Sequence, residues 1–308
     1  NQATGFKQHL TDLRNERTGK ALSASTLNST LNALKAFFLW LADQPGYRQS
    51  VRYADTEYFN ASKKDRAVAT AKRERPVPTP EQIRQVIASM PANTAIEKRD
   101  RALIAFIFLT GARDGAVSSM KLKHVDIERE AIFQDAREVR TKFAKTFTSN
   151  FFPVGDEVRT IVASWIDYLR RELLFGDDDP LFPATSVKPG ASRKFEVFGL
   201  SREHWSNTTP IRNVFRTAFA AQGLGYFNPH SFRKTLTRMG EQVCHTPEQF
   251  KVWSQNLGHG QVMTTFTSYG SVSENRQAEV MKQLAAPALH QDETLVEIQR
   301  LLDNSRRS

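Results

Sequence analysis

The chain has 308 residues, enough for two domains with cores of their own, and its ordinary balance of apolar and charged residues excludes a disordered or collagen-like protein. Lys and Arg outnumber Asp and Glu by 43 to 33, so the net charge is +10 and the chain attracts polyanions such as nucleic acid, although membrane-surface proteins and many enzymes are equally basic. The single cysteine, Cys244, excludes an intrachain disulfide. A single cysteine indicates a reducing compartment such as the cytoplasm. We find no signal peptide and no apolar run longer than Ala102 to Ala112, and therefore expect no membrane partner.

Residues 1–62 predict a helical first domain. Apolar residues recur every three or four positions at Leu27, Leu31, Leu34, Phe38 and Leu41, which is the pattern of one face of an amphipathic helix. Ser23 or Ser25 is available as the N-cap of this helix. Because the chain starts without a methionine, in sequence that is already helix-like, we expect this domain to be incomplete at its start.

Residues 63–78 predict a basic linker between two domains. Two prolines close it, and six basic residues outweigh Asp65 and Glu74: Lys63, Lys64, Arg66, Lys72, Arg73 and Arg75. Such a run is either a solvated tether or a strap laid across a nucleic acid, and the residues leave both readings open.

Residues 79–308 predict a second domain, mainly α with one small antiparallel sheet (an α+β fold). Thr79 to Gln82 is a capping box, and a helix over 97–109 is apolar nearly all round before Gly111 ends it. The strands are expected at 131–133, 138–140 and 151–154. Further helices are expected at about 156–174, 210–222, 232–243, 247–256 and 274–302.

Five short segments of this domain gather Arg, Lys, His and Tyr at helix ends and turns. In chain order they end at or contain Arg113, Lys142 with Lys145, His230 with Arg233 and Lys234, His259, and Tyr269. His230 and Arg233 lie three residues apart, so on a helix they share one face. A guanidinium and an imidazole together suit a phosphate, since Arg offers a bidentate fork and His moves protons near neutral pH. Each segment alone is commonplace, and only their coincidence is specific.

In this order, the segments resemble the boxes of the tyrosine recombinases, the phage integrase family. Thr110-Gly-Ala-Arg113 resembles the first arginine box, Leu257-Gly-His259 resembles the Leu-Gly-His box, and Leu34 to Leu41 is similar to the helical, DNA-gripping core-binding domain. The resemblance implies the catalytic set Arg113, Lys142, His230, Arg233, His259 and Tyr269.

The resemblance also implies chemistry and partners. Tyr269 would attack a DNA phosphate, with His230 as base, Lys142 as acid, and the two arginines and His259 on the phosphate oxygens. A 3′-phosphotyrosyl intermediate would form without cofactor, metal or ATP. The implied partners are a double-stranded DNA recombination site, three further copies of the chain in a tetramer on DNA, and accessory DNA-bending proteins. The implied location is the bacterial nucleoid or the cytoplasm of a phage host. Lys145 and Lys234 would join the linker in contacting DNA.

Two positions depart from the family pattern. Many members carry an acidic residue three positions after the first arginine, where this chain has Ala116, so Asp114, Asp126 or backbone groups would have to support Arg113. The interval from His259 to Tyr269 is also one residue longer than usual.

Other readings remain. The apolar faces around Pro287 pack either on their own domain or, as in the resembling family, on a neighbouring protomer. A type IB topoisomerase-like enzyme shares the same catalytic residue types but relaxes DNA as a monomer. A catalytically silent DNA-binding relative would lack a catalytic residue, and none is missing here.

Overall fold

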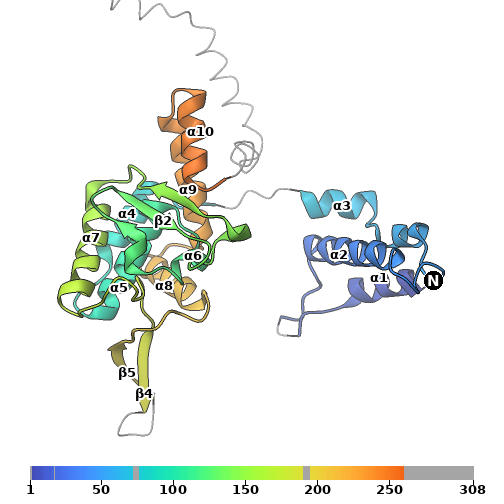
Figure 1. The fold of residues 1–308 in the computed structure, drawn as a ribbon, viewed down its shortest axis with the longest axis horizontal. Coiled ribbons are helices and arrows are strands. Elements are labelled where there is room, and N and C mark those ends of the chain that lie inside the picture. Colours follow the sequence, from blue (N-terminus) through green and yellow to red (C-terminus); the bar gives the residue numbers. More distant parts are fainter. Residues whose placement is uncertain (1, 17, 72–75, 190–194, 260–308) are drawn as a thin grey trace, which may run out of the picture. The chain divides into compact units, whose positions relative to one another are not determined.

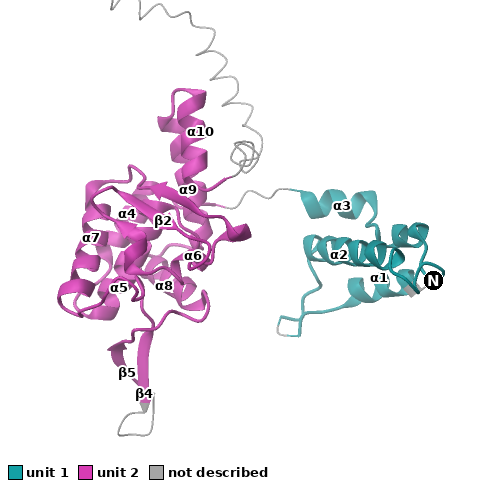
Figure 2. Ribbon diagram, in the orientation of Figure 1, with its two compact units in different colours: residues 1–75 teal, residues 76–308 magenta. Residues whose placement is uncertain are grey.

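The computed structural model describes residues 2–16, 18–71, 76–189 and 195–259. The chain divides into two compact units, residues 1–75 and residues 76–308 (Figures 1 and 2). No helix in these described ranges is both long enough and apolar enough to cross a membrane.

The first unit is helical and has a small core. Leu10, Leu31 and Phe59 are buried together, and Leu27, Leu34 and Phe38 pack against them, which confirms the predicted apolar face. Ser23 is the N-cap, because its hydroxyl accepts the N–H of Thr26. The elements are α1 (Gln2–Asp12), α2 (Ala24–Ala42), η1 (Tyr53–Phe59, a 3-10 helix) and α3 (Lys63–Thr70).

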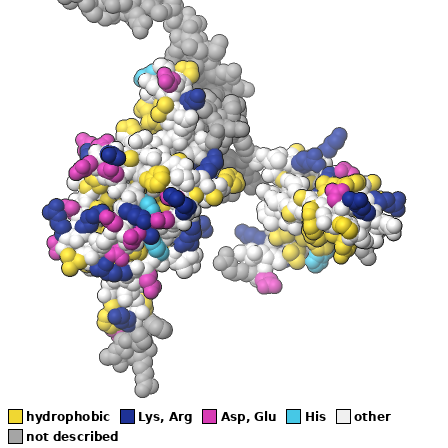
Figure 3. Space-filling model, in the orientation of Figure 1, with side chains coloured by type: hydrophobic (Ala, Val, Ile, Leu, Met, Phe, Trp, Pro, Cys, Tyr) yellow, Lys and Arg dark blue, Asp and Glu magenta, His cyan; other side chains and the backbone are white. Residues whose placement is uncertain are grey.

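Large apolar side chains also lie on the outside of this unit. Phe37 is 50% and Trp40 57% exposed, on the side of α2 that does not enter the core. In the view of Figure 3, apolar side chains gather on one face of the unit with Lys and Arg beside them. A unit as small as residues 1–75 buries a smaller fraction of its surface than a larger domain does, so some large side chains stay exposed.

The predicted linker is structured over its first half. Residues Lys63–Thr70 form α3, which packs along α2, and Ser62 caps it by accepting the N–H of Asp65. The run of charges obscured this helix, since α3 buries none of its own residues and therefore shows no apolar periodicity.

The second unit is built around α5, in which every residue from Ala102 to Thr110 is buried. Helix α5 packs against α7, α4, α8 and α9, so it is the centre of the core. The helices are α4 (Pro80–Ser89), α5 (Ala95–Thr110), α6 (Asp114–Val117), η2 (Leu122–His124), η3 (Lys142–Ala144), α7 (Asp156–Arg171), α8 (Thr209–Ala221), α9 (Pro229–Val243) and α10 (Pro247–Asn256).

A three-stranded antiparallel sheet precedes α7, in the order β1 (Val125–Asp126), β2 (Ala131–Gln134), β3 (Phe147–Asn150). The mainly α fold with a small antiparallel sheet agrees with the prediction, but two of the three predicted strands are wrong. Residues 138–140 belong to the loop between β2 and β3. Residues 151–154 follow β3, and Phe152 and Val154 among them are buried. The N–H of Phe152 bonds to the carbonyl of Leu109, so the apolar character of this run reflects contact with the core helix and not a place in the sheet.

A second hairpin, β4 (Thr185–Pro189) and β5 (Phe195–Leu200), extends away from the body of the unit (Figure 1). Its side chains are largely exposed, including Val187, Val197 and Phe198. The sequence analysis assigned no element here, because a two-stranded ribbon that buries neither face shows no alternation of apolar and polar residues strong enough to identify it.

Candidate active site

Arg233 joins three of the five motif segments. It lies on α9, which begins where Asn228 accepts the N–H of Ser231, and only 5% of its surface is exposed. Its guanidinium donates to the carbonyls of Gly111 and Leu257, and lies 3.2 Å from Nε2 of His259. The first arginine segment, the His-x-x-Arg segment and the Leu-Gly-His segment therefore meet at one side chain.

Gly111 makes this meeting sterically feasible. As predicted, it ends α5, and it does so with φ +63°, a left-handed conformation that favours glycine. A Cβ built on it would lie 3.0 to 3.2 Å from side-chain carbons of Leu257, Leu236 and Phe152. The chain then turns, and Arg113 becomes the residue before α6.

Arg113 and His230 line one open pocket of about 420 Å³, together with Asp114, Arg212, Tyr226, Asn228 and Pro229. His230 and Arg233 come from one helix, as expected, but His230 lines the open pocket while Arg233 is buried. Partial burial lowers the pKa of Arg113 from its ordinary value, though a guanidinium stays charged throughout the physiological range.

Neither Asp114 nor Asp126 supports Arg113 in place of an acidic residue at position 116, where this chain has Ala116. Asp114 pairs with Arg212 at 3.0 Å, and Asp126 accepts the N–H of Arg129. Within the described ranges, the guanidinium of Arg113 makes no hydrogen bond or ion pair with a carboxylate or with the backbone. Ala116 itself is buried in the core. A carboxylate buried at that position would be costly unless it paired with a positive group such as Arg113.

His259 is held at the end of α10 by contacts with β3. The side chain of Asn256 accepts the N–H of Asn150 and donates to its carbonyl, while the hydroxyl of Ser149 donates to the carbonyl of Asn256. Gly258 has φ +70°, and a Cβ on it would lie 2.6 Å from the ring of Phe147. Asn256 begins the motif segment of His259, but its bonds to β3 were not predicted, because nothing in its neighbourhood points to a strand 106 residues away.

The electrostatics of the two histidines show that the cationic groups converge. The pKa of His259 is lowered to about 4, first by burial, then by Arg233 and Arg113, and further by His230 and Lys142. The pKa of His230 is lowered by loss of hydration and by the same two arginines. The geometry supports two contacts among these groups: Arg233 lies beside His259, and Arg113 and His230 line the same pocket. Both imidazoles are neutral at pH 7, and the site attracts an anion.

Lys142 lies in the loop between β2 and β3, as predicted for the hairpin lysine. It is exposed, and its Nζ is 4.9 Å from the centre of the Phe143 ring. Phe143 and Ala144 have φ of +61° and +49°, conformations that cost energy for residues with side chains. The loop therefore holds a strained, solvent-exposed turn beside the site.

The remaining predicted residues divide into two sets. Lys63, Lys64 and Arg66 are exposed on α3, Lys145 is exposed in the β2–β3 loop, and Lys234 is half-buried on α9. Tyr269 lies outside the described residues, as do Lys72, Arg73, Arg75 and the predicted helix 274–302. The pocket adds one residue that the sequence did not single out, Arg212, whose partner Asp114 is 98 residues away in the chain.

The fold is that of DNA-bound recombinases. The structure of the Tn1549 transposon integrase in complex with transposon right end DNA matches with a TM-score of 0.58 and 17% identity, over 92% of this chain and 84% of that one. The XerH site-specific recombinase bound to a palindromic difH substrate matches with a TM-score of 0.59 and 14% identity, over 91% of this chain and 71% of that one. These likenesses show that the chain has the fold of those two proteins.

Sequence comparison specifies the family. Residues 77–276 match the phage integrase family, and the chain belongs to that family, the tyrosine-type site-specific DNA recombinases. Tyrosine recombinase XerD of Neisseria meningitidis serogroup A / serotype 4A is 25% identical over 237 residues, covering 76% of this chain and 68% of the relative. Tyrosine recombinase XerC of Escherichia coli O157:H7 is 24% identical over 249 residues, covering 80% and 70%.

Proposed function

We propose that this enzyme cuts and rejoins the strands of a specific DNA site through a covalent 3′-phosphotyrosyl intermediate on Tyr269. The observations that support the proposal are the contact of Arg233 with His259 and the pocket that Arg113 shares with His230, because fixed positive groups and hydrogen-bond donors stabilise the charge that builds up on a phosphodiester under attack. Lys142 lies in the β2–β3 loop, and its charge contributes to lowering the pKa of His259.

In the proposed step, the phenol oxygen of Tyr269 bonds to phosphorus as the bond from phosphorus to the 5′-oxygen breaks. The neutral imidazole of His230 takes the phenol proton, and the ammonium of Lys142 gives a proton to the departing 5′-oxygen. Atoms and charges balance: one phosphodiester is exchanged for a phosphotyrosine and a 5′-hydroxyl. The reverse reaction with another strand's 5′-hydroxyl completes the exchange. The energy of the bond is kept, so we propose no ATP and no metal ion.

The partners of the enzyme follow from the same proposal. Lys63, Lys64 and Arg66 on α3, with Lys145 and Lys234, contact the DNA backbone, and Lys72, Arg73 and Arg75 join them. Four copies act together on two DNA sites, with residues 285–308 of each docked on a neighbour. Deleting 285–308 then abolishes assembly of the tetramer while binding to a single site persists, whereas intact tetramers from the deleted chain contradict the docking.

A trapped covalent adduct tests the central claim. The binding site is first selected from random duplexes, and a nicked version of it then lets the cleaved fragment diffuse away so that the enzyme remains attached. We expect an SDS-resistant adduct in the presence of EDTA, and none with Tyr269→Phe. Specific binding by the wild type without any adduct contradicts the proposal. Relaxation of supercoiled DNA without a preferred site indicates a topoisomerase.

A further inference from the structure

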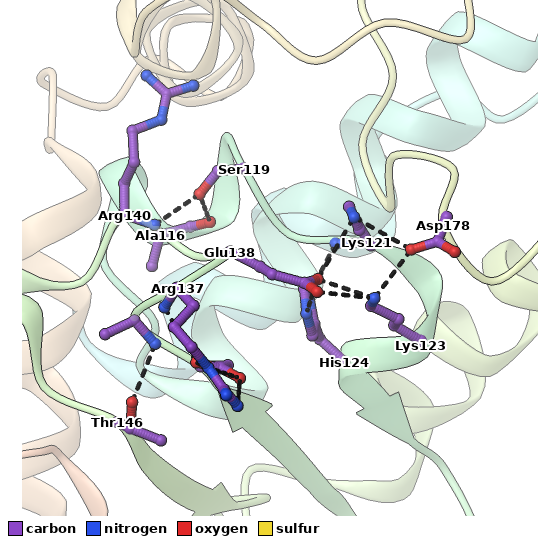
Figure 4. A network of polar contacts seen from close by, with 12 residues as sticks. Ala116, Ser119, Lys121, Lys123, His124, Arg137, Glu138, Arg140, Thr146 and Asp178 are labelled. Atoms are coloured by element: carbon purple, nitrogen blue, oxygen red, sulfur yellow. Dashed lines mark hydrogen bonds and ion pairs between the residues drawn. The ribbon is translucent and has the colours of Figure 1, made fainter.

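The β2–β3 loop is fastened immediately before Lys142. The backbone N–H of Arg140 donates to Oγ of Ser119 at 2.9 Å, and the hydroxyl of Ser119 donates to the carbonyl of Ala116 at 3.0 Å (Figure 4). Ala116 belongs to α6, the helix that starts directly after Arg113. Ser119 is 7% exposed, so water competes little for these bonds. One hydroxyl therefore links the loop of the lysine to the helix of the first arginine.

Glu138 fastens the same stretch from the other side. Its carboxylate accepts hydrogen bonds from Lys123 at 2.9 Å and from Nε2 of His124 at 3.2 Å. Because Nδ1 of His124 accepts the N–H of Lys121, the ring proton lies on Nε2 and is donated to the carboxylate. Asp178 pairs with both lysines, at 3.1 and 2.8 Å, and completes the network drawn in Figure 4.

The guanidinium of Arg140 adds a third attachment. It donates to the carbonyls of Trp205 and Ser206, at 3.1 and 3.3 Å, in the segment that leads to α8. Beyond this point the character of the loop changes, since residues 142–146 are exposed and include the two left-handed residues Phe143 and Ala144. A fixed stretch over 138–140 thus ends where an exposed arm begins, and Lys142 is the second residue after Arg140.

We propose that Ser119 and Glu138 are positioning residues for Lys142, which fix residues 138–140 so that the lysine reaches the leaving oxygen of a phosphate held by Arg113. The inference rests on the proposed role of Lys142 as the acid. Neither side chain has to touch DNA. Their effect is to define where the arm starts, and this sets how often the ammonium lies within proton-transfer distance of the 5′-oxygen.

Replacing the leaving oxygen by sulfur isolates this effect. In a duplex with a 5′-bridging phosphorothiolate, the bond from phosphorus to sulfur breaks and the sulfur departs as a thiolate without needing a proton, so a defect in proton donation disappears. The experiment compares single-turnover cleavage of oxygen and sulfur duplexes by the full chain and by Ser119→Ala, Glu138→Gln and Lys142→Ala. The matched control is Ser118→Ala, because the buried hydroxyl of Ser118 bonds to the carbonyl of Gly115 in its own helix.

We expect Ser119→Ala and Glu138→Gln to slow cleavage of the oxygen duplex by about 10- to 100-fold, less than Lys142→Ala does, and to cleave the sulfur duplex at nearly the wild-type rate. Ser118→Ala should cleave both at the wild-type rate. Equal slowing on both duplexes, or no slowing on either, overturns the positioning role. If sulfur restores Lys142→Ala but not Ser119→Ala, only this inference fails. If sulfur does not restore Lys142→Ala, the acid role in the proposed function fails, and the inference with it.

Discussion

Arg233 performs two tasks that a lysine cannot combine. Its fork donates to two backbone carbonyls from distant segments and also faces His259, whereas an ammonium is a point donor without that planar geometry. We expect Arg233→Lys to reduce the rate of adduct formation on the order of 10²-fold or more, and the unpaired carbonyl to lower the free energy of unfolding by about 1–3 kcal/mol. Single-turnover cleavage and urea unfolding measure the two effects.

The matched control is Arg238→Lys, on the same helix but exposed. It should leave both quantities near their wild-type values. Wild-type cleavage by Arg233→Lys would contradict the dual role assigned to the guanidinium.

His259 makes stability depend on pH. Its pKa in the folded protein, about 4, is below the ordinary 6.5, so the unfolded chain takes up a proton first as the pH falls. Above about pH 6.5 His259 is neutral in both the folded and the unfolded chain, and its contribution to the free energy of unfolding is fully present. As the pH falls toward 4, protonation favours the unfolded chain and this contribution is lost. We expect the free energy of unfolding, measured in urea across this range, to decline less steeply in His259→Asn than in the wild type. His245→Asn, at an exposed histidine, should keep the wild-type slope, and equal slopes for all three proteins would exclude this role of His259.

At the residue scale, the sequence identified reactive groups better than the groups that hold them. Arg113, His230, Arg233 and His259 carry recognisable motifs. The structure puts Arg233 beside His259, and Arg113 and His230 at one pocket. Ser119, Asn256 and Arg212 carry none, because a serine or an amide bonded across the fold has no signature in its own segment. The support expected for Arg113 from Asp114 was wrong for the same reason: its partner, Arg212, is distant in sequence.

At the scale of elements, the close contact between α10 and β3 places His259. Gly258 fits there because it has no side chain, its φ is +70° and the ring of Phe147 occupies the space a Cβ would need. We expect Gly258→Ala to lower the free energy of unfolding by about 1–3 kcal/mol. Because the substitution also displaces His259, we expect slower cleavage even under conditions in which the variant is fully folded. Chemical unfolding and single-turnover cleavage at low temperature separate the two effects.

Gly225→Ala is the control for this substitution, since a Cβ at Gly225 meets no atom within 4 Å. It should unfold and cleave like the wild type. If Gly258→Ala keeps full activity, the contact with Phe147 does not position the histidine.

Elements with strong local signals were predicted well. The capping box at Thr79 and the glycine that ends α5 appear as expected, and α10 has the predicted bounds. Of the three predicted strands, only 131–133 appears, as β2. The third was misplaced because β3 is a polar edge strand, Phe147–Asn150, while Phe152 and Val154 of the apolar run after it are buried in the core. Burial and strand structure give the same apolar pattern over four residues, so periodicity cannot distinguish them.

At the scale of the whole molecule, the net charge of +10 predicts affinity for DNA that depends strongly on salt. Lys63, Lys64 and Arg66 are exposed on α3. We expect their joint replacement by Gln to reduce the slope of log affinity against log salt by about 0.9 for each one that contacts a phosphate, with sequence preference unchanged. Binding titrations across a range of salt concentrations measure the slope.

Arg170→Gln with Arg171→Gln is the comparison, because these two exposed arginines at the end of α7 already face Asp177 and Asp167. Their removal should change the slope less per charge. An unchanged slope in the α3 variant would show that this helix does not lie on the DNA backbone.

The bonds of Arg233 to the carbonyls of Gly111 and Leu257 have a consequence for how this enzyme could change over generations. A lineage that no longer needed recombination would still need the chain to fold, and folding alone would purge most replacements of this arginine. Among the described residues, His230 and Lys142 are exposed and hold no such pair of carbonyls, so decay of activity would begin at positions of this kind. A silenced descendant would thus keep its buried arginine long after it had ceased to cut DNA.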